Sequence, residues 1–362
     1  MIIKKALVSM LWMTLLACSG HAEEPQKKTE TMAKYYTRQT RINDVMNDAV
    51  FGDYGRLIFP VNTGYWSGTT LEQLQLTWYN YIDPDKTVEV CNYLRAYADN
   101  CFIDIYTEAE KQANPELRNT GLFFFRGNSN EPFAICNAGG GFSYVGAMHD
   151  SFPHALELSK LGYNAFALIY RPGDAYEDLA RAITYICDHA NDLGVSPTGY
   201  SLWGGSAGAR MAATLGNSSY LRQLTGRTDI PQASAVIMQY TGYTTVSPYD
   251  GPTYACCGTS DGIASWRTMQ SRLESLSALG IPTEFHSYNG LPHGFGLGTG
   301  TVAEGWLQDA VHFWQSQSGA TAIHSAKANA GRSEAIYSLN GTRRNAMQKG
   351  INIVDGKKIV IR

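Results

Sequence analysis

The sequence predicts an α/β protein in which a mostly parallel central sheet carries helices on both faces. Short apolar runs typical of buried strands alternate with amphipathic stretches of helical spacing from about residue 120 onwards. Strands that alternate with helices of this length are joined by crossovers, which make neighbouring strands parallel. The chain has 362 residues and 44% hydrophobic content, which is enough to bury one large α/β core.

The expected elements follow one another in chain order. An edge pair at residues 102–106 and 121–126 opens the sheet, and Gly280-Ile281-Pro282 ends a later helix, because glycine and proline are helix-stop residues. Further strands are expected at 133–136, 166–170, 201–203, 253–257 and 283–288, and helices at 153–161, 177–190, 207–215, 263–279 and 303–315. The chain then divides into a signal peptide at 1–22 (1–17 in a lipoprotein), a short aromatic-rich N-terminal extension at 23–101, the α/β domain at 102–318 and a small β-type C-terminal tail at 319–362.

Ser206 is the first candidate catalytic residue. It lies at the centre of GGSAG, between an apolar strand candidate and an Ala-rich helix candidate. A strand, sharp turn and helix in this order present a serine as a nucleophile, and its neighbours two positions away must be small. Gly204 and Gly208 meet that need. The alternative is a closely packed glycine-rich turn in which the serine is filler.

Asp261 and His293 are the expected partners of this serine. Each follows a predicted strand, so each lies at the carboxyl edge of the sheet, where such folds present functional side chains. One helix and one strand separate them, so both loops emerge at the same edge. The chain order of serine, acid and histidine matches a known triad order. Alone, Asp261 could serve a local turn and His293 could cap a helix.

Three glycines after the strand at 133–136 suggest an oxyanion hole. Serial glycines let backbone N–H groups point at a developing negative charge. Gly140 and Gly141 are the expected donors, together with Ala207, which follows the serine. The alternatives are a flexible linker and a phosphate cradle, but the GxGxxG and GK[ST] spacings of a phosphate cradle are lacking. Aromatic residues that follow core strands are candidates for the substrate pocket: Phe142, Tyr144, Tyr240 and Tyr243.

Together these motifs resemble the α/β-hydrolase superfamily. The resemblance rests on GGGF, YRPGD, GGSAG, GTSDG and LPHGF and covers about residues 102–317. It is strongest to the esterase branch with the hormone-sensitive-lipase-like enzymes and the feruloyl- and acetyl-esterases of plant-polysaccharide degraders. The resemblance implies that Ser206 is the nucleophile, Asp261 the orienting acid and His293 the base. The chain departs from the lipase-like HGGG pattern at Ala138, which replaces its histidine.

The first residues predict export. Lys4 and Lys5 precede an apolar run and small residues, as in a secretory signal. Cleavage before Glu23 would release the protein, whereas a lipobox ending at Cys18 would attach a lipid. Either cut places the protein in the periplasm, at the outer membrane or outside a Gram-negative, Bacteroidota-like cell. Among the other cysteines, Cys91 and Cys101 alone lie outside predicted core elements and could form a disulfide.

Charge and composition limit the partners. The chain carries a net charge of −3, but residues 322–362 hold eight basic and two acidic residues, so the domain before them is more acidic than the whole. An acidic domain argues against nucleic acid and anionic lipid as partners. The basic tail, with an Asp355-Gly356 hairpin turn, resembles a C-terminal sorting or anchoring tail. The alternative is a disordered basic extension.

We expect a secreted serine carboxylic-ester hydrolase that removes acetyl or feruloyl-type groups from plant cell-wall carbohydrate. No cofactor is expected, and no HExxH or CxxC spacing suggests a metal. The alternatives are a prolyl-oligopeptidase-type peptidase and a catalytically silent surface binder. The aromatic residues of the extension could clamp it to the domain or line an acyl or sugar subsite: Tyr65, Trp66, Trp78, Tyr79 and Tyr81. The sequence does not indicate an oligomeric state.

Overall fold

The computed structural model describes residues 36–318 and four stretches of the tail, 336–338, 343–344, 350–354 and 357–361. The predicted signal peptide with Cys18 and the predicted Asp355-Gly356 turn lie outside these residues. Within them, no helix combines the length and the apolar character needed to span a bilayer.

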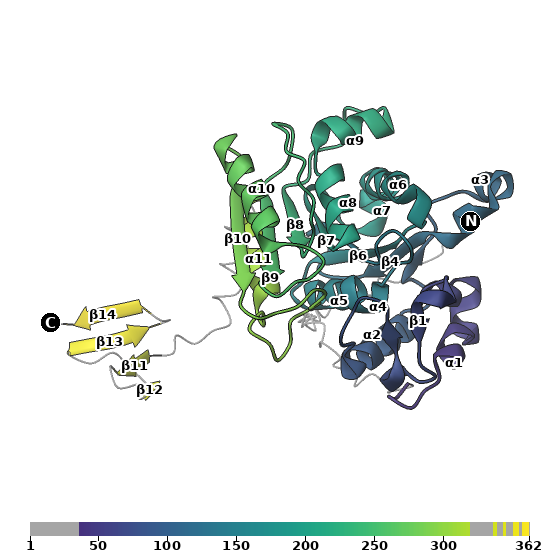
Figure 1. Ribbon diagram of the computed structural model, residues 1–362, viewed down its shortest axis with the longest axis horizontal. Helices are drawn as coiled ribbons and strands as arrows, with labels where there is room; N and C mark the ends of the chain where they lie inside the picture. The colour runs from purple at the N-terminus through teal and green to yellow at the C-terminus, as the bar shows by residue number, and fades with distance from the viewer. Residues whose placement is uncertain (1–35, 319–335, 339–342, 345–349, 355–356, 362) are drawn as a thin grey trace, which may run out of the picture. The chain divides into compact units, whose positions relative to one another are not determined.

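The central sheet confirms the predicted α/β class. Its strands run in the order β10-β9-β8-β7-β5-β6-β4-β3. β4 is antiparallel to β3 and β6, as expected for an edge pair, and the other neighbouring strands are parallel (Figure 1). The strands are β3 (Phe102–Ile103), β4 (Gly121–Phe125), β5 (Pro132–Asn137), β6 (Asn164–Ile169), β7 (Ser196–Gly205), β8 (Ala235–Gln239), β9 (Thr253–Gly258) and β10 (Thr283–Tyr288).

Helices cover both faces of this sheet (Figure 1). α5 (Phe152–Lys160) and α11 (Trp306–Ser318) pack on one face, and α6 (Ala175–Asp188), α8 (Ala207–Leu215) and α10 (Trp266–Ala278) pack on the other. The helices pack in this way because each has an apolar face. In α6, for example, the buried residues recur at helical spacing and form one such face. Shorter helices join these elements: α4 (Ala147–Asp150), η5 (Pro172–Asp174), α7 (Ala190–Leu193) and α9 (Ser218–Thr225).

The N-terminal extension shares the core of the α/β domain. Ile42, Val45 and Phe51 are buried in the same hydrophobic cluster as the central strands. α2 (Pro84–Ala96) packs against α5, and Lys86 bridges to Glu157 of α5 at 2.7 Å. The other elements before β4 are α1 (Ile42–Met46), η1 (Ala49–Leu57), η2 (Thr63–Tyr65), β1 (Trp66–Ser67), η3 (Leu71–Gln73), β2 (Gln75–Leu76), α3 (Glu108–Ala113) and η4 (Pro115–Asn119).

Three of the differences from the sequence prediction concern elements near the site. No bounds were predicted for β8, although Tyr240 was expected to follow a core strand, because periodicity alone does not separate strand from helix in so short an apolar run. α10 begins at Trp266 and not at 263, because the Asp261 carboxylate accepts hydrogen bonds from the N–H groups of Ile263 and Ala264 and holds them in a turn. α11 begins after Gly305, whose φ of 97° is incompatible with a right-handed helix.

The cysteines of the described residues are all free thiols. Cys91 and Cys101, the pair considered for a disulfide, are both buried and unbridged. Burial raises the pKa of Cys101 to about 11, so this thiol stays protonated near neutral pH. These cysteines therefore act as small hydrophobic residues of the core.

The described strands of the tail form a small antiparallel sheet in the order β12-β11-β13-β14. They are β11 (Ile336–Ser338), β12 (Arg343–Arg344), β13 (Gly350–Val354) and β14 (Lys357–Ile361). β13 and β14 pair as a hairpin that closes between Val354 and Lys357, on either side of the predicted turn. The β-type character predicted for the tail is present in these stretches.

Candidate active site

Ser206 occupies a sharp turn between β7 and α8. Its φ of 52° and ψ of −115° are unfavourable for a residue with a side chain, and the packing around it holds the serine there. The flanking glycines are required sterically. A Cβ atom on Gly204 would lie 2.2 Å from the backbone of Gly208, and one on Gly208 would lie 2.0 Å from the carbonyl oxygen of Asn137. The turn therefore explains why GGSAG needs small residues on both sides of the serine.

Asp261 and His293 meet Ser206 at the carboxyl edge of the sheet. His293 Nε2 is 3.2 Å from Ser206 Oγ, and His293 Nδ1 is 2.8 Å from Asp261 Oδ2. The Asp261 side chain is fully buried, and that of His293 is 8% exposed. The structure thus brings together the three residues that the sequence predicted as a triad, in hydrogen-bonding geometry.

The surroundings of Asp261 keep its carboxylate charged. Burial raises its pKa, but the hydrogen bonds from His293 and from the backbone of Ala264 and Ile263 outweigh burial and hold the pKa below its ordinary value. An ionised Asp261 can only accept a hydrogen bond, so Nδ1 of His293 carries the hydrogen and donates it to Asp261. Nε2 of the neutral ring is then free to accept the hydroxyl proton of Ser206, as a general base requires.

The glycine loop after β5 leaves backbone donors beside the serine. Gly140 and Gly141 have φ values of 131° and 59°, and a Cβ atom on Gly140 would lie 2.1 Å from the carbonyl oxygen of Tyr144. The N–H groups of Gly140 and Gly141 donate to no acceptor among the described residues. Ala207 is the first residue of α8, where an N–H has no partner within the helix. These three N–H groups are the predicted oxyanion donors.

Comparisons with known proteins agree with this geometry. A family model described as BD-FAE matches residues 127–252, which include Ser206 and the glycine loop but end before Asp261 and His293. No curated protein sequence matches the chain. An acetyl ester-xyloside bifunctional hydrolase from Caldicellulosiruptor lactoaceticus is similar in structure, with a TM-score of 0.52, 20% identity, and coverage of 59% of this chain and 95% of that one.

A second similar structure is MGS-M1, an α/β hydrolase enzyme from a Medee basin deep-sea metagenome library. It has a TM-score of 0.50 and 21% identity, and the alignment covers 60% of this chain and 97% of that one. The chain has the α/β-hydrolase fold. The resemblance to esterases of this superfamily, drawn above from five motifs, is also confirmed.

A buried carboxylate contacts the glycine loop, and sequence reasoning missed it. Asp150, at the end of α4, accepts hydrogen bonds from the Tyr79 hydroxyl at 2.5 Å, the Tyr240 hydroxyl at 2.5 Å and the N–H of Gly139 at 3.0 Å. Burial and the Asp150 charge raise the pKa of both tyrosines well above the ordinary value, so both hydroxyls stay protonated donors. Asp150 lies between His149 and Ser151 and belongs to no motif, so it had no clear signal in the local sequence.

Asp150 connects three parts of the candidate site. Gly139 precedes the oxyanion glycines, and Tyr79 comes from the N-terminal extension. Tyr240 follows β8; its ring lies edge-on to His293 at 5.0 Å, and its hydroxyl accepts from the N–H of Gly296 at 3.3 Å. The extension is therefore tied to the site by a direct hydrogen bond.

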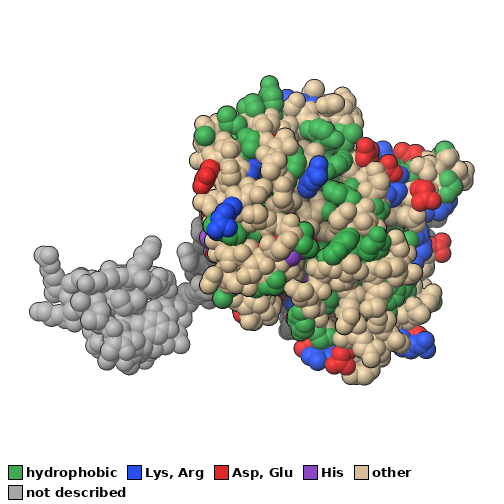
Figure 2. All heavy atoms as spheres, in the orientation of Figure 1, with side chains coloured by type: hydrophobic (Ala, Val, Ile, Leu, Met, Phe, Trp, Pro, Cys, Tyr) green, Lys and Arg blue, Asp and Glu red, His purple; other side chains and the backbone are tan. Residues whose placement is uncertain are grey.

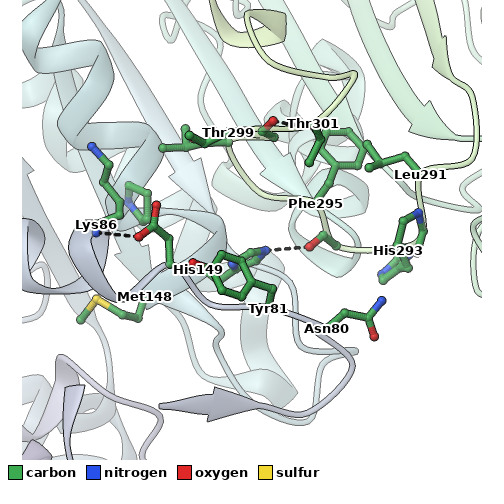
Figure 3. Close-up of a pocket in the computed structure, with 16 residues that line it drawn as sticks. Asn80, Tyr81, Lys86, Met148, His149, Leu291, His293, Phe295, Thr299 and Thr301 are labelled. Carbon is green, nitrogen blue, oxygen red and sulfur yellow. Dashed lines mark hydrogen bonds between the residues drawn. The ribbon is translucent and has the colours of Figure 1, made fainter. Parts of the chain in front are cut away.

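Two cavities lie at the triad, one lined by Ser206 and the other by His293. The first, of about 360 Å³, is lined by Ser206 and by the oxyanion residues Gly141 and Ala207. The second, of about 350 Å³, is lined by His293 and by Asn80 and Tyr81 of the extension (Figure 3). An ester bound at Ser206 would have a cavity available for each of its two halves.

The four predicted pocket residues do not all line the same cavity. Phe142, Tyr240 and Tyr243 line the cavity that contains Ser206. The structure places Tyr144 away from it, along a cavity of about 430 Å³. There its hydroxyl donates to the carbonyl oxygen of Thr77, and its ring stacks on Tyr65 at 5.1 Å. Tyr144 thus helps to fasten the extension to the glycine loop.

The described residues contain no group of three or more His, Cys, Asp or Glu side chains that could hold a metal ion.

Proposed function

We propose that this protein is a serine carboxylic-ester hydrolase that removes acetyl or feruloyl-type acyl groups from plant cell-wall carbohydrate. The observation that carries the proposal is the chain of contacts from Asp261 through His293 to Ser206, beside three unpaired backbone donors. A buried carboxylate, an oriented imidazole and a serine on a strained turn form the arrangement that activates a hydroxyl for acyl transfer.

The chemistry follows from these positions. His293 Nε2 takes the proton of Ser206 Oγ as the oxygen attacks the ester carbonyl. The N–H groups of Gly140, Gly141 and Ala207 bind the negative oxygen that forms, and each such donor is worth about 3 kcal/mol. His293 then gives its proton to the departing alcohol, which leaves an acyl-serine. Water, deprotonated by His293, attacks that ester, the bond between the acyl carbon and Ser206 Oγ breaks, and His293 returns the proton to Ser206 as the carboxylic acid leaves.

The cavity at Ser206 supports an acyl group larger than acetyl. Its volume of about 360 Å³ is much more than a methyl group fills, and Phe142 and Tyr243 provide aromatic walls. Flat aromatic acids pack well between such walls. The acetyl alternative is supported by the similar structure whose name describes an acetyl ester-xyloside hydrolase. Assays of acetylated and feruloylated oligosaccharides side by side would decide between the two acyl classes.

The experiment that tests the proposal is Ser206→Ala, assayed on p-nitrophenyl acetate beside an aminoacyl-p-nitroanilide. We expect wild type to cleave the ester and not the anilide, and the variant to lose about 10⁶-fold in turnover with an unchanged fold. His293→Ala should lose nearly as much, and Asp261→Asn somewhat less, because the base remains but loses its orientation. Anilide cleavage would indicate a peptidase, and residual activity above a few per cent would place the nucleophile elsewhere.

The serine mechanism needs no metal ion, so EDTA should leave the rate unchanged. Activity lost on chelation and restored by zinc would contradict the mechanism.

We also propose that the protein is exported, either released after residue 22 or held at the outer membrane through a lipid on Cys18. The charged and apolar pattern of residues 1–22 supports this proposal. The mass of the mature N-terminal peptide from the native host distinguishes the two cuts. An N-terminus that begins at Met1 in a cytoplasmic fraction would contradict both.

A further inference from the structure

We propose that the cavity between His293 and the N-terminal extension is the subsite for the alcohol half of the ester, and that Asn80 and Tyr81 bind a neutral sugar ring there. The inference rests on the ester hydrolysis proposed above. It adds a location, two binding residues and a ligand class for the leaving group. Asn80 and Tyr81 lie outside residues 127–252, which the family model matches, so this subsite belongs to the chain's own extension.

The position that the leaving alcohol must take determines which half of the ester each cavity binds. When the bond between the carbonyl carbon and the alcohol oxygen breaks, that oxygen takes the proton that His293 received from Ser206. The alcohol must therefore depart within reach of His293 Nε2. The oxyanion donors Gly141 and Ala207 line the other cavity, together with Ser206. The acyl group accordingly occupies that cavity, and the alcohol occupies the cavity that His293 lines.

Two segments far apart in the sequence form the walls of the alcohol cavity. The loop from Leu291 to Phe295, with His293, forms one wall, and Asn80 and Tyr81 approach from the extension (Figure 3). The cavity volume of about 350 Å³ lies within the range of about 300–1,000 Å³ typical of small-molecule sites. It is therefore large enough for a small ligand.

The polar groups of this cavity fit a sugar. Tyr81 is 67% exposed and lines the cavity, so its ring is accessible to a ligand there. The Asn80 amide, the Tyr81 hydroxyl and the Thr299 hydroxyl have no hydrogen-bond partner among the described residues. A tyrosine ring offers an apolar face with a polar tip. A pyranose or furanose ring presents apolar C–H faces and a rim of hydroxyls, which matches this combination.

The charges of the cavity indicate that the sugar is neutral. Asp83 accepts from the N–H groups of Asp85 and Lys86 at the start of α2. The Lys86 ammonium is paired with Glu89 at 2.5 Å and with Glu157 at 2.7 Å. The Lys86 cation is therefore already paired with two carboxylates, and Asp83 adds a negative charge to the lining. A phosphate or uronate would lose hydration there without gaining an opposite charge.

The test uses two pairs of esters, and the members of each pair share an acyl group and differ in the alcohol. The first pair is methyl ferulate and a feruloylated arabinoxylan oligosaccharide, and the second is ethyl acetate and an acetylated xylo-oligosaccharide. Tyr81→Ala and Asn80→Ala should each lower kcat/KM for the sugar ester by about 10-fold, mainly through KM, and leave the simple ester unchanged. Tyr249→Ala is the control, because Tyr249 is 56% exposed and lines neither cavity. It should change neither ester.

The possible outcomes separate this inference from the proposed function. An equal loss on both esters, or no loss on either, would overturn the alcohol subsite while ester hydrolysis stands. A wild-type enzyme that cleaves the simple esters but not the sugar esters would overturn the carbohydrate ligand. If wild type cleaves none of the four esters, the proposed function itself fails. Thermal melting of each variant shows that the comparison is made on folded protein.

Discussion

At the residue scale, the site depends on hydrogen bonds that the local sequence does not reveal. Three residues were predictable because a motif joins each reactive side chain to turn-forming glycines: Ser206 in GGSAG, Asp261 in GTSDG and His293 in LPHGF. Asp150 and Tyr79 carry no such mark. Their bond joins residues 71 positions apart, and only the folded chain brings them together. Interactions of this kind depend on tertiary packing, which periodicity and spacing do not encode.

The Asp150 contacts predict a kinetic effect for Tyr79→Phe. Loss of the hydroxyl leaves Asp150 with one donor fewer and loosens the loop that bears the oxyanion glycines. A hydrogen bond to a buried charged group is worth about 1.5–3 kcal/mol. We therefore expect kcat on p-nitrophenyl acetate to fall about 10-fold or more, with KM little changed, because the loop acts on the transition state.

Tyr106→Phe is the matched control for this prediction. Tyr106 also donates to a buried carboxylate, that of Asp178, at 2.9 Å, but it lines neither of the two cavities beside His293. It should lower stability without lowering kcat. If both variants lost kcat equally, the effect of Tyr79 would be one of general stability and not of positioning.

His154 predicts a pH dependence of stability. It is buried on α5, with its ring 5.5 Å from that of Trp306. Burial is the largest influence and lowers its pKa to about 4; the nearby His149 acts in the same direction and Asp150 opposes it. The unfolded chain, with an ordinary histidine pKa of about 6.5, binds the proton first as pH falls. Stability is therefore intact above pH 6.5 and is lost progressively between pH 6.5 and 4.

The loss should reach about 3 kcal/mol in the free energy of unfolding. Urea denaturation of wild type and His154→Gln at a series of pH values measures it. The curve of the variant should lack this component and run flatter between pH 6.5 and 4. His312→Gln, which changes an exposed histidine of α11, should retain the wild-type slope. Parallel curves for wild type and His154→Gln would contradict the assignment.

At the scale of elements, strands and helices were predictable where the pattern was long or ended in a strong stop signal. The αβ unit between Asp261 and His293 was predicted, since Gly280 and Pro282 mark the end of its helix. The start of α10 was not, because a side chain, Asp261, holds the preceding backbone in a turn. Element ends are decided by such individual hydrogen bonds and dihedral angles, and these do not follow from composition.

The packing of β5 against the turn of Ser206 predicts the effect of Gly208→Ala. The added Cβ would lie 2.0 Å from the carbonyl oxygen of Asn137, and neither backbone can yield without moving a core strand. We expect a loss of about 3 kcal/mol or more of stability, or no folded protein. Gly262→Ala is the control, because its Cβ would meet nothing within 4 Å. Melting curves of the two variants compare them, and equal stability would mean that the turn adjusts.

At the scale of the whole molecule, the sequence divided the chain into an extension, an α/β domain and a tail. It did not predict how the extension contributes to the site. The extension was expected either to clamp the domain or to line a subsite. The structure shows the clamp, because Tyr65 stacks on Tyr144; Tyr81 lines the cavity at His293, which we propose as a subsite. On the face in Figure 2, many of the acidic side chains lie around α3 and the N-terminal helices, and the centre is mainly uncharged. That distribution suits a neutral substrate.

The last prediction concerns removal of the C-terminal tail. The α/β core closes at α11, where the indole N–H of Trp314 donates to the carbonyl oxygen of Gly199 at 2.7 Å and the side-chain amide of Gln315 donates to the Tyr163 hydroxyl at 2.6 Å. The basic tail after it differs in charge from the acidic domain. Truncation after Gly319 should therefore leave activity and melting temperature unchanged but alter cell fractionation in the native host.

A shorter chain that ends after Val311 provides the comparison, because it removes Trp314 and Gln315 and with them both bonds to the core. It should unfold at a lower temperature and lose activity, whereas the truncation after Gly319 should not. If the longer truncation also unfolds the enzyme, the tail stabilises the core and does not sort the protein. If it remains folded and active and its location is unchanged, the sorting role is wrong as well, since a sorting signal must act on location.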